Sequence, residues 1–312
     1  KAIAMGHDLG HAPFGHHGEK VIDTYYQKYL GEIFWHEKNG LYFVDNVELL
    51  PDRNNRMRNL NLTYAVRDGI ISHCGEKDIN CLKPRGELCD LEKFTIPGEF
   101  EPATYEGCVV KISDKIAYVG RDIEDAINLG FLTYENLKEL KRIGKLEDGS
   151  AVNTSGIISN MIRDICIEST PEKGICLSSE TSEILNKIKA FNYKYIYGNE
   201  RFEAFKKYAS LIIGELFEVL YSCYNGGDVE AGFAKKSAVY PWLLKEFKDY
   251  LKKYCQKAHF LSDGEKTIEK YVNKKIYKDL SVERTFVRAI LDYISGMTDR
   301  YAVDCFNRLV TY

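Results

Sequence analysis

The sequence has no apolar run long enough to cross a lipid bilayer, and no secretory signal peptide precedes its first motif. We therefore expect a cytoplasmic protein without a membrane partner. Internal repeats and low-complexity tracts are also absent. These absences indicate an ordinary globular chain.

The sequence also has no excess of basic residues over acidic ones. Lys+Arg 43 stand against Asp+Glu 46, which leaves a net charge of −3. The whole molecule therefore has no strong electrostatic attraction to nucleic acid, although a local basic groove stays open as an alternative. Lysines cluster between residues 252 and 278, but acidic residues interleave with them, which is typical of a solvated helical face.

The nine cysteines include no CxxC pair. An odd number of scattered cysteines without paired spacing indicates neither a zinc ribbon nor a disulfide framework. We therefore expect all of them to be reduced, as in a cytoplasmic protein.

The 312 residues are 45% hydrophobic, which is ample for a sizeable core, and we predict a single domain over residues 1–312. Apolar residues recur at helical spacing along 202–220 and 286–297, the second run with Ser281 as its N-cap, so the sequence predicts an all-α fold. Proline and glycine punctuate residues 75–102, which we expect to form an irregular excursion or short hairpin between two helices. A second loop is expected over residues 144–156.

Four of the seven histidines lie within the run HDLGHAPFGHHGE, which starts at His7. Imidazole binds transition metals, and carboxylates add the oxygen ligands that manganese, iron or magnesium prefer. His7 and His11 are four residues apart, so on a helix they share a face, and the adjacent Asp8 can bind the same ion. This part of the run therefore predicts a metal site.

The second part of the run is interrupted by Pro13 and Gly15, which are expected to end the first helix. His16 and Glu19, three residues apart, then approach the site from a second direction. The alternative is a histidine-rich polar surface. A shaped turn is favoured over it because proline, phenylalanine and glycine stand together between the histidines.

The whole run resembles the metal-binding segment of HD-domain phosphohydrolases, specifically the deoxynucleoside triphosphate triphosphohydrolases of the dGTPase family. The resemblance implies an all-α HD-domain core with additional C-terminal helices, and metal-dependent hydrolysis of dNTPs to deoxynucleoside and inorganic triphosphate. It implies a divalent ion (manganese or magnesium favoured over iron, nickel or zinc) bound by His7 and Asp8. The catalytic residues it implies are His16 with Glu19, His11 and His36.

Residues 106–122 place Asp114, Lys115, Tyr118 and Asp122 in one wedge, roughly 100° wide, of a predicted helix whose other side is apolar. By pattern alone, an ordinary surface helix is an equal alternative. The resemblance implies that Asp114 is the last protein ligand of the metal and that Lys115 meets the phosphates. It also implies that Tyr118 and Asp122 hold the 3′-hydroxyl of the sugar.

Further stretches match the same family. The run FWHE around His36 resembles its His-Glu segment, and residues 292–301 resemble its closing helix, which we interpret as scaffold. Residues 189–197 stand where the family places a basic residue and a tyrosine near the nucleotide. Lys189, Tyr193 and Tyr197 are the candidates, with packing of the tyrosines in the core as the alternative.

HD-type sites usually take one further histidine from a helix upstream, and the chain begins at Lys1 inside an apparent helix. We therefore expect weak metal binding until that histidine is supplied. The alternative functions are another HD-type nucleotidase or phosphodiesterase, or a non-catalytic nucleotide-binding regulator; a nucleophile at His73-Cys74 is a distant third. The resemblance also implies a homo-oligomer and a dNTP activator.

Overall fold

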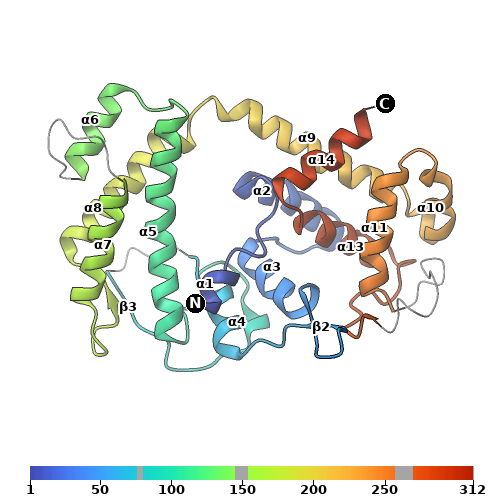
Figure 1. Cartoon of the computed structure of the whole chain (residues 1–312), viewed down its shortest axis with the longest axis horizontal. Helices are drawn as coiled ribbons and strands as arrows, with labels where there is room; N and C mark the ends of the chain where they lie inside the picture. Colours follow the sequence, from blue (N-terminus) through green and yellow to red (C-terminus); the bar gives the residue numbers. More distant parts are fainter. Residues whose placement is uncertain (76–79, 145–153, 257–269, 312) are drawn as a thin grey trace. The chain divides into compact units, whose positions relative to one another are not determined.

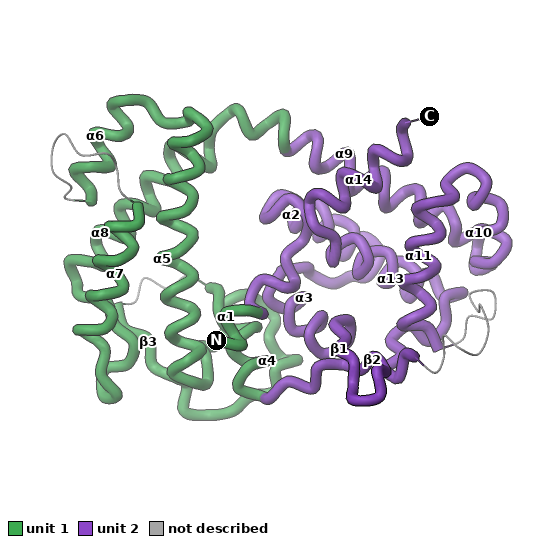
Figure 2. Tube along the Cα trace, in the orientation of Figure 1, with its two compact units in different colours: residues 1–5, 64–205 green, residues 6–63, 206–312 purple. Residues whose placement is uncertain are grey.

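The computed structural model describes residues 1–75, 80–144, 154–256 and 270–311. These residues are mostly helical, and the only sheets among them are two antiparallel pairs of short strands (Figure 1), so the predicted all-α fold is confirmed. They form two compact units, Lys1–Met5 with Tyr64–Phe205 and Gly6–Thr63 with Lys206–Tyr312 (Figure 2). The assignment of one domain to residues 1–312 stays a prediction.

The elements fall into two sets. In the first unit they are α1 (Ala2–Gly6), α4 (Tyr64–Ile71), β3 (Cys81–Leu82), η3 (Leu91–Lys93), α5 (Tyr105–Asn128), α6 (Tyr134–Ile143), α7 (Thr154–Glu168), β4 (Ile175–Cys176), α8 (Ser179–Asn192) and η4 (Tyr193–Tyr197). In the second they are α2 (Gly15–Tyr25), η1 (Tyr26–Leu30), α3 (His36–Tyr42), η2 (Phe43–Val47), β1 (Leu49–Pro51), β2 (Met57–Asn59), α9 (Phe202–Tyr221), η5 (Asn225–Gly227), α10 (Val229–Ser237), α11 (Pro241–Tyr254), α13 (Glu283–Ser295) and α14 (Asp299–Val310). The unit boundaries fall near the end of α1 and inside α9.

Helix α5 organises the first unit. Thr104 caps its start by accepting a hydrogen bond from Gly107 N at 3.1 Å. Its apolar face, with Ile112, Ile116 and Ile123, is buried in a core shared with α7 and α8. The polar wedge predicted from the sequence is therefore the opposite face of a helix that is fixed by its apolar side.

The first unit also corrects the expectation that all cysteines are reduced. Strands β3 and β4 pair Cys81 with Cys176, and a disulfide joins these two residues. Their sequence separation of 95 is too large for any spacing rule to predict the pair. Strand β3, within the predicted excursion, thus pairs with residues 175–176.

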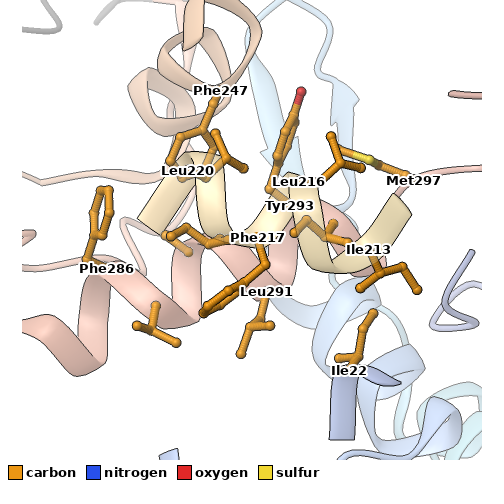
Figure 3. Packing of buried hydrophobic residues seen from close by; sticks show 14 of the residues in the cluster. Ile22, Ile213, Leu216, Phe217, Leu220, Phe247, Phe286, Leu291, Tyr293 and Met297 are labelled. Carbon is orange, nitrogen blue, oxygen red and sulfur yellow. The ribbon is translucent and has the colours of Figure 1, made fainter. Parts of the chain in front are cut away.

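The second unit is built around α9 and α13. Ile213, Leu216, Phe217 and Leu220 from α9 pack against Phe286 and Leu291 from α13, with Phe247 and Ile22 beside them (Figure 3). The predicted helical periodicity of both runs is confirmed. The predicted N-cap is off by one residue: Val282 stands before α13, and the Ser281 hydroxyl donates to Asp279 instead.

A buried carboxylate ties α13 to three other parts of this unit. Asp292 accepts hydrogen bonds from Tyr42 at 3.0 Å, Tyr277 at 2.8 Å and Arg288 Nε at 2.8 Å. Tyr26 adds a longer one at 3.4 Å. The contacts agree with the scaffold interpretation of residues 292–301, because a buried charge is stable only when it is fully paired.

The start of α14 has a scaffold role too. Asp299 accepts a hydrogen bond from the backbone nitrogen of Phe14 at 2.8 Å, and a Cβ on Gly296 would lie 2.8 Å from Phe43. Among the described residues, no helix is long and apolar enough to cross a membrane. Most of the loop predicted over 144–156 and the centre of the lysine cluster lie outside those residues.

Candidate functional site

The first part of the histidine-rich run does not lie on a helix. Helix α1 ends at Gly6, so His7 and His11 do not share a helix face, and that prediction was wrong. A turn follows, in which Phe14 and Gly15 have φ values of 67° and 61°, and α2 begins at Gly15. The left-handed pair starts α2, which carries His16 and Glu19 one turn apart as predicted.

Close backbone packing holds this turn against α3. Asn39 Nδ2 donates to Gly10 O at 2.8 Å, and Asn39 is 4% exposed. A Cβ on Gly10 would overlap the backbone nitrogen of Gly40, so only glycine fits. Because α3 begins at His36, this packing sets the position of His36 relative to the turn.

Three imidazoles and one carboxylate gather where α2 meets α3. Glu19 Oε2 lies 3.0 Å from His36 Nδ1 and 3.5 Å from His16 Nδ1. His11 stacks on His36 with ring centroids 4.6 Å apart and lies 5.3 Å from His16. The four predicted catalytic residues are thus brought together, from segments up to 25 residues apart in sequence.

The electrostatics of this cluster differ from one member to the next. Burial lowers the pKa of His11, and the neighbouring His36 lowers it further. Burial opposes the charged form of Glu19, but hydrogen bonds to His16 and His36 outweigh it and lower its pKa to about 2. Burial also opposes the charged form of His36, yet the Glu19 hydrogen bond leaves its pKa raised. An ionised Glu19 is therefore held between two imidazoles.

Sequence reasoning missed the role of two neighbours of His36. Glu37 is 2% exposed and its Oε2 lies 3.5 Å from His36 Nδ1, so the imidazole has a second carboxylate beside it. Asn39 fixes the turn, as described above. The run FWHE contained Glu37, but nothing local distinguishes a buried glutamate from an exposed one.

The first two predicted metal ligands face each other. His7 Nε2 lies 3.2 Å from Asp8 Oδ2, with 22% and 55% of the two side chains exposed. Ligands bound to one ion at about 2.0–2.2 Å lie about 3 Å apart, so this pair of donors fits one edge of a metal's coordination shell. A nitrogen and a carboxylate oxygen suit manganese, iron or zinc.

In the other unit, the polar wedge of α5 is present. Asp114, Lys115, Tyr118 and Asp122 are all half-buried along one side of the helix. Asp122 accepts a hydrogen bond from the Tyr197 hydroxyl. Burial, and then this hydrogen bond, raise the pKa of Tyr197.

The remaining candidates are Tyr193 and Lys189. Tyr193 meets Tyr197 edge to face, with ring centroids 5.1 Å apart, and is 60% exposed. Lys189 is buried on α8. Tyr197 therefore contacts a predicted sugar-binding residue directly, Tyr193 lies on the surface, and Lys189 is part of the helix packing.

Comparison with known proteins shows which proteins this chain is similar to. The phosphohydrolase-associated domain matches residues 257–308. The chain is 29% identical over 305 residues to the deoxyguanosinetriphosphate triphosphohydrolase-like protein of Caldanaerobacter subterraneus, covering 97% of this chain. It is 28% identical over 320 residues to the protein of that name from Rickettsia akari and 28% over 312 residues to that from Clostridium perfringens, covering 99% of this chain each time. Over nearly its whole length, the chain is therefore similar to the deoxyguanosinetriphosphate triphosphohydrolase-like proteins.

The resemblance recognised in the histidine-rich run is thereby confirmed. The chain spans 65% of the Caldanaerobacter relative, 74% of the Rickettsia relative and 68% of the Clostridium relative. The roles of its individual site residues stay predictions.

Proposed function

We propose that this chain hydrolyses deoxynucleoside triphosphates to a deoxynucleoside and inorganic triphosphate. The observation that carries the proposal is the ionised Glu19 shared between His36 at 3.0 Å and His16 at 3.5 Å. A carboxylate that orients an imidazole is the usual way to hold a proton ready for transfer. The choice of substrate is supported by the similarity to deoxyguanosinetriphosphate triphosphohydrolase-like proteins.

In the proposed site a divalent ion is held by His7, Asp8 and Asp114. Manganese and magnesium are favoured, because two of the three ligands are carboxylates. When bound, such an ion activates water and polarises the α-phosphate. The fit rests on the His7–Asp8 pair, whose donor atoms are 3.2 Å apart, while Asp114 comes from the family resemblance.

His16 is the proposed general acid. Water attacks the α-phosphorus, the bond from that phosphorus to the 5′-oxygen breaks, and Nε2 of His16 gives its proton to the departing oxygen. Nδ1 faces Glu19, so Nε2 is the atom left for the substrate. The side chain of His16 is 79% exposed, whereas that of Glu19 is 16% exposed, which leaves the imidazole accessible and its partner fixed.

The other residues are proposed to bind and orient the substrate. His11, with its lowered pKa, is a neutral partner for the phosphate or the water. Lys115 neutralises charge on the triphosphate, and Tyr118 and Asp122 hold the sugar, with a tight fit that leaves no space for a 2′-hydroxyl. Tyr197 orients the Asp122 carboxylate through its hydrogen bond.

The test uses the full-length protein with manganese and each dNTP or rNTP, and identifies the phosphorus product by ion chromatography. We expect triphosphate from dNTPs and none from rNTPs. Pyrophosphate or orthophosphate as first product would instead assign the chain to other HD-type nucleotidases. Light scattering with and without dNTPs tests the proposed homo-oligomer and its nucleotide activation.

A further inference from the structure

The cluster of His11, His16, Glu19 and His36 has a composition that proton transfer alone does not require. One donor atom from each of the four side chains lies within 4.8 Å of the others. Three imidazoles and a single carboxylate are the ligand set of zinc-type ions, whereas magnesium and calcium prefer oxygen. The His7–Asp8 pair has a different donor set.

The distances within the cluster suit one small ion. Tetrahedral ligands at about 2.0–2.1 Å from zinc are separated from each other by about 3.3 Å. Glu19 Oε2 lies 3.0 Å and 3.5 Å from the two Nδ1 atoms of His36 and His16, which brackets that value. Modest side-chain rotation of His11, stacked on His36 at 4.6 Å, supplies the fourth donor.

The neighbouring residues hold one side of the cluster in place, while His16 is open to solvent. His36 is 6% exposed and stands at the start of α3, next to the Asn39–Gly10 hydrogen bond. Only His16 is largely exposed, so an ion has an entry path that needs no backbone movement. The adjacent His17 is turned away and hydrogen-bonds Ser210 at 2.9 Å.

We infer that His11, His16, Glu19 and His36 form a second metal site, which binds Zn²⁺ and thereby inhibits the enzyme. Zinc bound by His16 Nδ1 and Glu19 Oε2 takes the place of the contact between these two atoms, so the carboxylate no longer orients the imidazole or stabilises its protonated form. The inhibitory effect rests on the proposed function, whereas the binding does not. High free zinc therefore switches off hydrolysis even when manganese occupies the first site.

Binding is tested by zinc titration, with Co²⁺ as a spectroscopic probe, in protein carrying Asp8→Asn to weaken the first site. We expect this variant to retain one tight equivalent of zinc. His16→Ala in that background should weaken it about 100-fold or more, and the change is safe for folding because His16 is exposed. His17→Ala is the matched control and should bind as before.

Zinc binding that Asp8→Asn abolishes, or that His16→Ala leaves unchanged, would overturn the second site. The activity arm adds zinc to the manganese-loaded protein and measures triphosphate release. Inhibition that persists at excess manganese supports the proposal, and zinc bound without inhibition overturns the inhibitory role. A protein that hydrolyses no nucleotide refutes the proposed function, while the titration still decides the site.

Discussion

Glu19 lies between two imidazoles, and its environment was not visible in its immediate sequence. The i, i+3 spacing predicted the His16 contact, but the shorter contact is to His36, 17 residues away. Since both neighbours stabilise the carboxylate, its pKa falls to about 2 in the folded chain against 4.5 for an ordinary glutamate.

This shift predicts an acid-sensitive contribution to stability. A carboxyl group with a depressed folded pKa stabilises the fold fully above pH 4.5 and loses that effect as the pH falls toward 2. After allowance for partial exposure, the contribution is about 1–2 kcal/mol. Urea unfolding of metal-free wild type and Glu19→Gln at pH 6, 4 and 3 measures it. Parallel pH profiles for the two proteins would contradict the assignment.

The close packing around Gly10 predicts that a side chain added there destabilises the fold. Gly10→Ala places a Cβ against the backbone of Gly40, which cannot move without shifting α3. We expect a loss of at least about 2–3 kcal/mol in the free energy of unfolding. Gly86→Ala is the control, because nothing lies within 4 Å of its Cβ, and it should change stability by less than about 0.5 kcal/mol. Equal losses in the two variants would refute the packing argument.

At the scale of elements, α13 is held by one buried carboxylate rather than by apolar packing alone. Asp292 is 1% exposed and bonds to side chains from η1, α3, the segment before α13, and α13 itself. Its burial and its hydrogen bonds make Asp292 part of the scaffold that carries the histidine cluster.

Asp292→Ala should therefore be among the most destabilising substitutions. It leaves Arg288 and three tyrosine hydroxyls without this acceptor, which costs about 3–5 kcal/mol. Asp304→Ala on α14 is the control: its side chain is 56% exposed and 4.0 Å from Arg300, so a change within about 0.5 kcal/mol is expected. Chemical denaturation measures both, and a comparable small effect for Asp292→Ala would contradict the role of this carboxylate.

The β3–β4 pair predicts a redox-dependent stability. The Cys81–Cys176 disulfide closes a loop of 95 residues, and such a crosslink adds about 2–4 kcal/mol. Reductant should lower the melting temperature of the wild type and leave that of the Cys81→Ser, Cys176→Ser double variant unchanged. Cys166→Ser, at an exposed free cysteine, should behave as wild type. Alkylation of all nine cysteines in unfolded, unreduced protein would disprove the disulfide.

At the scale of the whole molecule, the proposed reaction assigns catalysis to His16 and substrate binding to Asp122. His16→Ala should lower kcat by about 10²–10⁴-fold with little change in KM, because its contribution arises as the leaving oxygen gains charge. Asp122→Ala should mainly raise KM, by about tenfold or more, because it removes an acceptor for the 3′-hydroxyl. His17→Ala, bonded to Ser210, is the control for both. Steady-state triphosphate release checks all three, and the reverse pattern would exchange the two roles.

Some features of this protein follow from the sequence by itself. Helical periodicity is a local property, so the all-α class, the amphipathic α5 and the runs in α9 and α13 were predictable. The histidine-rich run was recognisable because its histidines and carboxylates are close together in sequence. Local sequence patterns did not predict that α1 ends at Gly6, before His7.

Only the tertiary structure decided which distant residues meet. His36 bonds to Glu19 across 17 residues, Tyr197 to Asp122 across 75, and Cys81 to Cys176 across 95. No local periodicity encodes these pairs, because they depend on how complete helices pack on their apolar faces. The sequence thus determined the elements and the chemical groups, while helix packing decided which groups share a carboxylate, a hydroxyl or a disulfide.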